Sequence, residues 1–152
     1  MVAACGLRAS GAIQSVGILD CDQHYGNGTD DIIERLGARG WVKNHTAGSR
    51  FGNPRQVPDF FVWLDECLEQ MGRCDVILYQ AGADPHVLDP LGGWLTTEEL
   101  QRRDLTVFEK ARKYRVPIVW NLAGGYQVLE DGTIPQVLLI HGNTMRACCS
   151  VY

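Results

Sequence analysis

Short apolar runs alternate with longer helical patterns along the whole chain. The runs are apolar on both faces, as in parallel strands that helices cover on both sides. We expect strands at Val16–Leu19, Gly40–Val42, Val76–Tyr79 and Pro117–Leu122. We expect helices at Asp30–Ala38, Pro58–Met71, Thr96–Tyr114 and Ile134–Cys148. This βα alternation predicts an α/β fold of three layers (αβα) with a mainly parallel sheet.

Composition narrows the class of protein. The chain has 152 residues and a formal net charge of −4 from 14 basic and 18 acidic side chains, which fits a single domain, residues 1–152. Basic residues form no stripe, and Arg102-Arg103 is interpreted as a solvated helix face, so we expect no nucleic-acid partner. Neither a membrane-spanning stretch nor a signal peptide is recognisable, which predicts a cytoplasmic protein without a membrane partner.

The six cysteines include no CxxC pair. This spacing indicates neither a zinc–thiolate site nor a disulfide framework, and most of the thiols are expected to be free and buried.

Candidate metal ligands follow two of the predicted strands. Asp20, Asp22 and His24 occupy alternate positions after an apolar run, and side chains two apart on a strand leave the same face. Asp84 follows Val76–Tyr79, and ligands gather beyond the carboxyl ends of parallel strands. Asp22, His24 and Asp84 would form an oxygen-rich site suited to Zn²⁺ or Fe²⁺. For Asp84 alone, a turn residue before proline is an equally good interpretation.

A third loop, Ala123-Gly124-Gly125-Tyr126, follows the last predicted strand. Its glycines allow backbone to approach a ligand closely, and the phenol of Tyr126 can donate to an anionic oxygen.

Together the three loops resemble the histone deacetylase family and its bacterial relatives, the acetylpolyamine and acetoin-utilisation type amidohydrolases of the arginase-deacetylase fold. LDCDQHYGNGT resembles the family segment D-x-D-x-H-x-G-x-G-T, AGADPHVLDPLGG resembles G-x-D-x-H-x-x-D-P-L-G-G, and AGGY resembles G-G-G-Y. The resemblance runs from about Val16 to Tyr126 with matching order and spacing.

The resemblance implies a metal-dependent hydrolase of acetyl-amides such as acetyl-lysine or acetylpolyamine. Asp22, His24 and Asp84 would be the metal ligands, with zinc or iron as the ion. Tyr126 would polarise the acyl carbonyl and stabilise the oxyanion. Asp20, deeper on the same strand face, would orient the metal ligands.

Substrate contacts are also implied by the resemblance. They fall on Gly124, Gly125 and Trp94, although a buried aromatic under the loop is an alternative interpretation of Trp94.

Family domains are about twice as long, and their front half carries a tandem histidine pair that acts as general base and acid. None of the four histidines here adjoins another, so we expect a truncated domain that corresponds to the C-terminal half. His86, two residues after Asp84, is a candidate substitute base; a histidine that packs within its loop is the alternative.

Lys43 stands where relatives usually have a serine that helps to bind a monovalent cation. We expect its ammonium group to replace that cation and pair with Asp20, the alternative being a solvent-facing lysine at a strand end.

A sheet of about four strands would leave one edge open, so we expect a homodimer or higher oligomer. Two functions remain open at this point. The chain is a metal-dependent deacetylase, weak or inactive through truncation, or it is a non-catalytic remnant that binds a metal or a small ligand as an oligomer.

Overall fold

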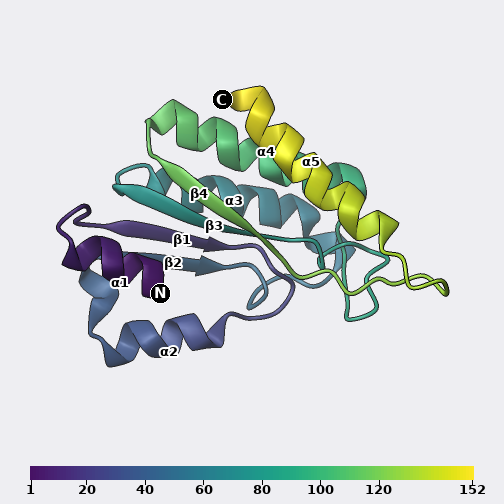
Figure 1. Cartoon of the computed structure of the whole chain (residues 1–152), viewed down its shortest axis with the longest axis horizontal. Coiled ribbons are helices and arrows are strands. Elements are labelled where there is room, and N and C mark those ends of the chain that lie inside the picture. The colour runs from purple at the N-terminus through teal and green to yellow at the C-terminus, as the bar shows by residue number, and fades with distance from the viewer.

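The computed structural model describes residues 1–152 as a four-stranded parallel sheet in the order β2–β1–β3–β4 (Figure 1). The strands are β1 (Val16–Asp20), β2 (Val42–Thr46), β3 (Val76–Gly82) and β4 (Ile118–Ala123). The helices are α1 (Val2–Ala9), α2 (Asn27–Arg35), α3 (Val57–Met71), α4 (Thr97–Tyr114) and α5 (Pro135–Val151). Short 3-10 turns lie at Ala38–Gly40 and Pro54–Gln56.

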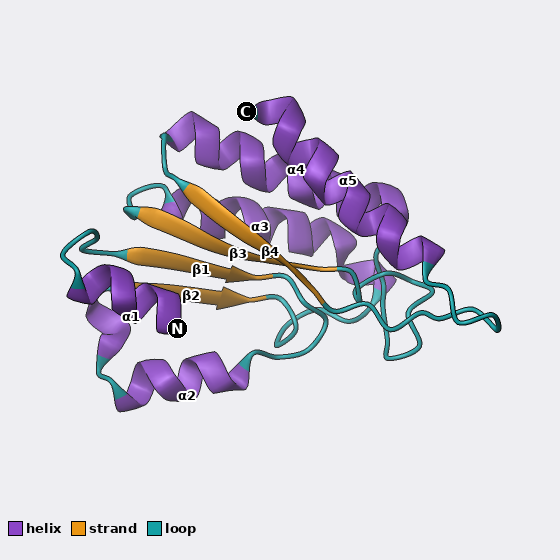
Figure 2. Cartoon of the chain, viewed as in Figure 1, coloured by secondary structure: helices purple, strands orange, loops and turns teal.

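Helices cover both faces of the sheet, which confirms the predicted three-layer α/β fold (Figure 2). Helices α1 and α2 lie on one face, and α3, α4 and α5 lie on the other. Alternate residues of each strand point to opposite layers. Val16 and Val76 therefore pack toward α1 and α2, whereas Leu19, Ile77 and Tyr79 belong to the larger core under α3, α4 and α5. None of the helices is long and apolar enough to cross a membrane.

Local sequence signals explain where two helices begin. Thr96 and Glu99 form a capping box, in which each side chain accepts from the backbone N–H of the other residue. Pro58 lies in the first turn of α3, where its missing N–H costs no hydrogen bond.

The second strand lies at Val42–Thr46 rather than at the predicted Gly40–Val42, where Ala38–Gly40 form a 3-10 turn instead. This strand is at the edge of the sheet and is only half buried. Its central residues, Lys43, Asn44 and His45, are polar, so an apolar pattern does not mark this strand. Helix α1 also has no counterpart among the predicted helices.

All six cysteines are free, as expected, but only Cys21, Cys67 and Cys74 are buried. Cys21 lies in the larger core, away from the carboxylates that flank it.

Candidate metal centre

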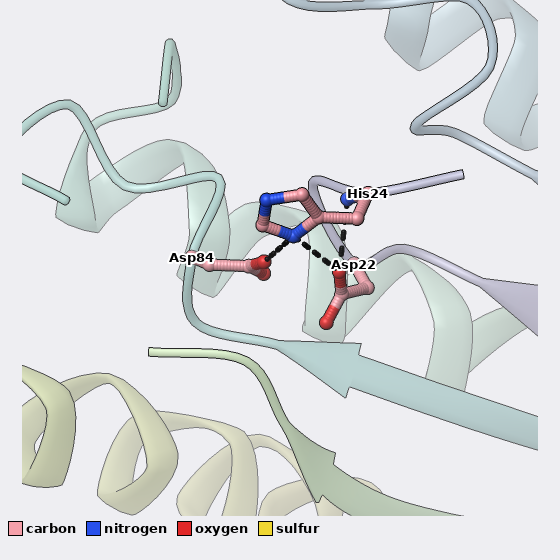
Figure 3. A group of neighbouring side chains, drawn as sticks. All are labelled: Asp22, His24 and Asp84. Carbon is pink, nitrogen blue, oxygen red and sulfur yellow. Dashed lines mark hydrogen bonds and ion pairs between the residues drawn. The ribbon is translucent and has the colours of Figure 1, made fainter. Parts of the chain in front are cut away.

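Strands β1 and β3 are parallel neighbours, so the loops that follow them meet at the carboxyl ends of the strands. There Nδ1 of His24 lies 2.9 Å from Oδ2 of Asp84 and 3.2 Å from Oδ1 of Asp22 (Figure 3). One potential ligand atom from each residue lies within 4.8 Å of the other two. Asp84 is fully buried and the His24 side chain is half exposed. The fold therefore brings the three predicted ligands together beyond the carboxyl ends of β1 and β3.

The loop after β1 is shaped by its own carboxylates. Strand β1 ends at Asp20, so Asp22 and His24 do not extend from a strand as predicted. Instead, Oδ1 of Asp20 accepts from the Asp22 N–H (3.1 Å), and Oδ1 of Asp22 accepts from the His24 N–H (2.9 Å). These two side chain to backbone turns explain why polar residues alternate here.

Asp84 joins the two ligand loops. Its Oδ1 accepts from the Gln23 N–H at 3.1 Å, and Gln23 in turn accepts from Nε1 of Trp94 at 2.9 Å. Burial, and to a lesser extent the contact with Asp22, raise the pKa of Asp84 to about 7. A buried carboxylate beside a second carboxylate is offset by a divalent cation, so this donor set fits a metal ion.

The glycine loop after β4 lies directly against the carboxylates. Gly124 has φ +49°, and a Cβ atom there would lie 2.2 Å from Oδ1 of Asp84 and 2.8 Å from Oδ2 of Asp22. Gly125 has φ +118°, and its Cβ would lie 2.8 Å from Val137. Both positions require glycine, because a side chain at 124 would clash with the two carboxylates and one at 125 would clash with Val137.

Tyr126 stands beside the candidate ligands. Its ring meets the His24 ring edge-on at a centroid distance of 6.0 Å, and the residue is 47% exposed. The Tyr126 N–H donates to Oδ2 of Asp89 at 2.7 Å. Sequence reasoning did not single out Asp89; its place in the D-P-L-G-G segment is the signal that was available.

Three predicted site residues lie elsewhere. His86 is buried, with Nε2 3.0 Å from Oγ1 of Thr97 and Nδ1 accepting from the Leu88 N–H, and it is not one of the clustered candidate ligands. These contacts are the ones expected of the alternative, a histidine packed within its loop. Trp94 is also buried and packs edge-on against Phe60, so it does not form the expected rim for substrate.

The predicted pairing of Lys43 with Asp20 is wrong as well. Lys43 lies opposite Gly17 in the parallel register, and side chains alternate along a strand, so Lys43 and Asp20 leave opposite faces of the sheet. The Lys43 ammonium donates to the carbonyl of Gln70 in α3. Asp20 accepts instead from Nε2 of Gln80 at 3.2 Å.

Arg103 is fully buried, so the prediction of a solvated helix face is wrong for this residue. Its Nη1 donates to the carbonyls of Gly82 (2.8 Å) and Cys21 (3.3 Å), and its Nε donates to Asp104 at 2.8 Å. The two carbonyls belong to the ends of β3 and β1, next to the candidate ligands. Arg103 thus ties together the two strands from which the ligand loops start.

Comparisons with known proteins agree with this fold. No protein-family model matches the chain. An uncharacterized protein of Picosynechococcus sp. is 26% identical over 163 residues, which cover 96% of this chain and 53% of the relative. The HDA15 HD domain superposes with a TM-score of 0.69 at 20% identity, covering 97% of this chain and 49% of that one. The histone deacetylase Clr3 superposes with a TM-score of 0.63 at 16% identity, and the match covers 92% of this chain and 27% of Clr3.

The chain therefore has a histone deacetylase-like fold. It spans about half the length of the curated relative that it matches.

Proposed function

We propose that the chain binds one divalent metal ion, zinc or iron, and hydrolyses acetyl-amides such as acetyl-lysine or acetylpolyamine. The observation that carries the proposal is the convergence of Asp22, His24 and Asp84 against a glycine loop with a phenol beside them. One imidazole and two carboxylates leave coordination positions open for water and substrate. The likeness to histone deacetylase domains supports the reaction class by analogy of fold.

Each residue of the centre has a distinct task in this proposal. A bound metal ion would supply Lewis acidity and lower the pKa of a water molecule. Asp84 and Asp22 would balance its charge, and Asp20 fixes the Asp22 backbone from behind. Tyr126 would donate its hydroxyl hydrogen to the acyl oxygen as negative charge develops there. Asp89 holds the Tyr126 backbone in position for that contact.

A second candidate function is metal binding without turnover. It is favoured by the position of His86, which is buried and hydrogen-bonded away from the metal centre. No other histidine of the chain belongs to the cluster of candidate ligands besides His24. A general base contributes typically 10²–10⁴-fold in rate, so a centre without one is expected to be slow.

Metal titration is the experiment that tests the proposal. Metal-free protein is titrated with Co²⁺ or Zn²⁺ beside Asp84→Asn, with Asp31→Asn as a matched control because Asp31 is an exposed carboxylate in α2. We expect one ion per chain in the wild type and the control, and none in Asp84→Asn. Absence of binding in the wild type would refute both candidate functions.

Turnover then separates the two functions. The loaded protein is assayed with an acetyl-lysine peptide and with an acetylated polyamine, beside Tyr126→Phe. Hydrolysis that falls in Tyr126→Phe supports the hydrolase. Metal binding without hydrolysis of either substrate supports the second candidate.

A further inference from the structure

The two edges of the sheet are built differently. Strand β2 carries Lys43 at its exposed edge, and a charged side chain is a usual defence against pairing with another strand. Strand β4 reads Ile-Val-Trp-Asn-Leu-Ala and carries neither charge nor proline. Val119 is 60% exposed, and Leu122 is more than half exposed. The composition of β4 is that of a strand inside a sheet, although it lies at the edge.

The free backbone groups of β4 can be assigned from its pairing with β3. The carbonyls of Pro117 and Ala123 accept from the N–H groups of Ile77 and Ala83. Backbone groups alternate in direction along a strand, so those of Ile118, Trp120 and Leu122 point to the open edge. The only side chain that reaches them is Asn121, whose Nδ2 donates to the carbonyl of Leu122 at 3.0 Å.

Helix α5 adds a second unpartnered surface. Leu138, Gly142, Met145 and Cys149 follow one another at helical spacing. Leu138, Met145 and Cys149 are exposed, and a Cβ at Gly142 would meet only the side chain of Arg146. The stripe is apolar, with a small residue in the middle where another helix could approach.

We propose that β4 pairs with β4 of a second copy of this chain, in antiparallel orientation about a two-fold axis through Trp120. This register matches Trp120 with its copy and Ile118 with Leu122 of the copy, which uses all the free backbone groups in about six hydrogen bonds. The axis runs perpendicular to the sheet, so both α5 helices lie on the same face of the joined sheet. The metal centre is not needed for this assembly.

A second copy fits this surface better than a charged partner does. A two-fold interface places the same patch on both subunits, and an uncharged apolar patch is complementary to itself. Val119, Leu122, Leu138 and Met145 are each more than half exposed. At roughly 100 Å² each, together with a strand edge about 20 Å long, they approach the roughly 800 Å² per partner of a standard interface.

The first test measures molar mass by size-exclusion chromatography with light scattering. We expect the wild type to elute with twice the mass of one chain, which is 16.9 kDa. Val119→Lys should be a monomer, because it places a charged side chain within the paired strands, opposite Asn121 of the copy. Val62→Lys is the matched control, since Val62 is also 60% exposed but lies on α3, and it should remain a dimer. Urea unfolding of the Val119→Lys monomer checks that it is folded.

The register has its own test. In the proposed pairing Val119 faces Asn121 of the copy, where Cα atoms are about 4.5 Å apart. Val119→Cys/Asn121→Cys in a Cys149→Ser background should therefore form an intermolecular disulfide, and neither single variant should do so efficiently. A monomeric wild type at high concentration, or a dimer that survives Val119→Lys, overturns the proposal. If the wild type is a dimer but the double cysteine variant forms no intermolecular disulfide, this register is overturned.

Discussion

Replacement of Arg103 by methionine should destabilise the protein and weaken metal binding together. Arg103 is fully buried and pairs with Asp104, whose other partners are the hydroxyls of Tyr79 and Thr144. Without the guanidinium, Asp104 keeps a buried charge that only neutral donors contact. Breaking a buried pair in this way costs about 3–5 kcal/mol. We expect a loss of about 4 kcal/mol in the free energy of unfolding.

The carbonyls that Arg103 contacts explain the effect on the metal. Cys21 and Gly82 lose their common donor, so the guanidinium no longer braces the ends of β1 and β3 beside Asp22 and Asp84. We expect a weaker affinity for Co²⁺, measured by its absorption spectrum under conditions where the variant is folded.

A neighbouring arginine and a compensating variant make the Arg103 experiment decisive. Urea unfolding is measured in the presence of chelator for Arg103→Met, Arg102→Met and Arg103→Met/Asp104→Asn. Arg102 lies over the ring of Phe61 at the surface of α4, so its variant should lose less than about 1 kcal/mol. The double variant should recover part of the loss, because asparagine removes the unpaired charge and keeps an acceptor for Tyr79. An Arg103→Met protein as stable as the wild type, or a double variant no better than the single one, would show that the ion pair does not act as described.

Four further predictions follow from the metal centre and the core. Gly124→Ala should abolish Co²⁺ binding, because its Cβ would lie 2.2 Å from Oδ1 of Asp84; Gly132→Ala has a similar positive φ of +80° with nothing within 4 Å and should bind normally. Tyr126→Phe should lower kcat by about 10²–10³ and leave the metal affinity unchanged in titrations; equal kcat would contradict its role as a donor. Chelator should lower the thermal midpoint, because saturation at about 100 times Kd adds about 2.7 kcal/mol to the unfolding free energy; an unchanged midpoint would count against a native metal site. Burial lowers the pKa of His45 in the folded protein, and its Nε2 is buried without a partner. The contribution of His45 to stability is therefore fully present above the pKa that this histidine has in the unfolded chain, and it is lost as the pH falls below that value. In urea titrations, His45→Gln should lose less stability than the wild type between neutral and mildly acidic pH.

The two central strands of the sheet were predictable because most of their residues are buried. Strands β1 and β3 lie between other strands and under helices on both faces, so their sequences are nearly continuous apolar runs. Strand β2 is at an edge and its exposed residues, such as Lys43, match no such run. The family resemblance predicts a contact between Lys43 and Asp20, but the face on which Lys43 lies is set by the register between strands, which spacing along the chain does not encode.

The candidate ligands were predictable because strand order carries them to one place. Asp22, His24 and Asp84 each follow a strand, and β1 and β3 are parallel neighbours. The direction of a side chain within a loop was not predictable: His86 turns toward the beginning of α4, where Thr97 offers a hydroxyl. The burial of Arg103 was not predictable either, because the carbonyls that accept from its guanidinium belong to Cys21 and Gly82, which are distant in sequence.

The position of Asp84 connects stability with metal binding. A fully buried carboxylate next to Asp22 is costly to ionise, which is why the pKa of Asp84 is raised to about 7. The backbone of Gly124 excludes any side chain that could neutralise this group from the side of β4. A divalent cation removes the cost and releases the proton that Asp84 otherwise retains. Metal affinity should therefore increase with pH through neutrality, and Asp84→Asn should be more stable than the wild type in chelator at alkaline pH. An Asp84→Asn protein less stable than the wild type there would mean that the carboxylate stabilises the metal-free fold.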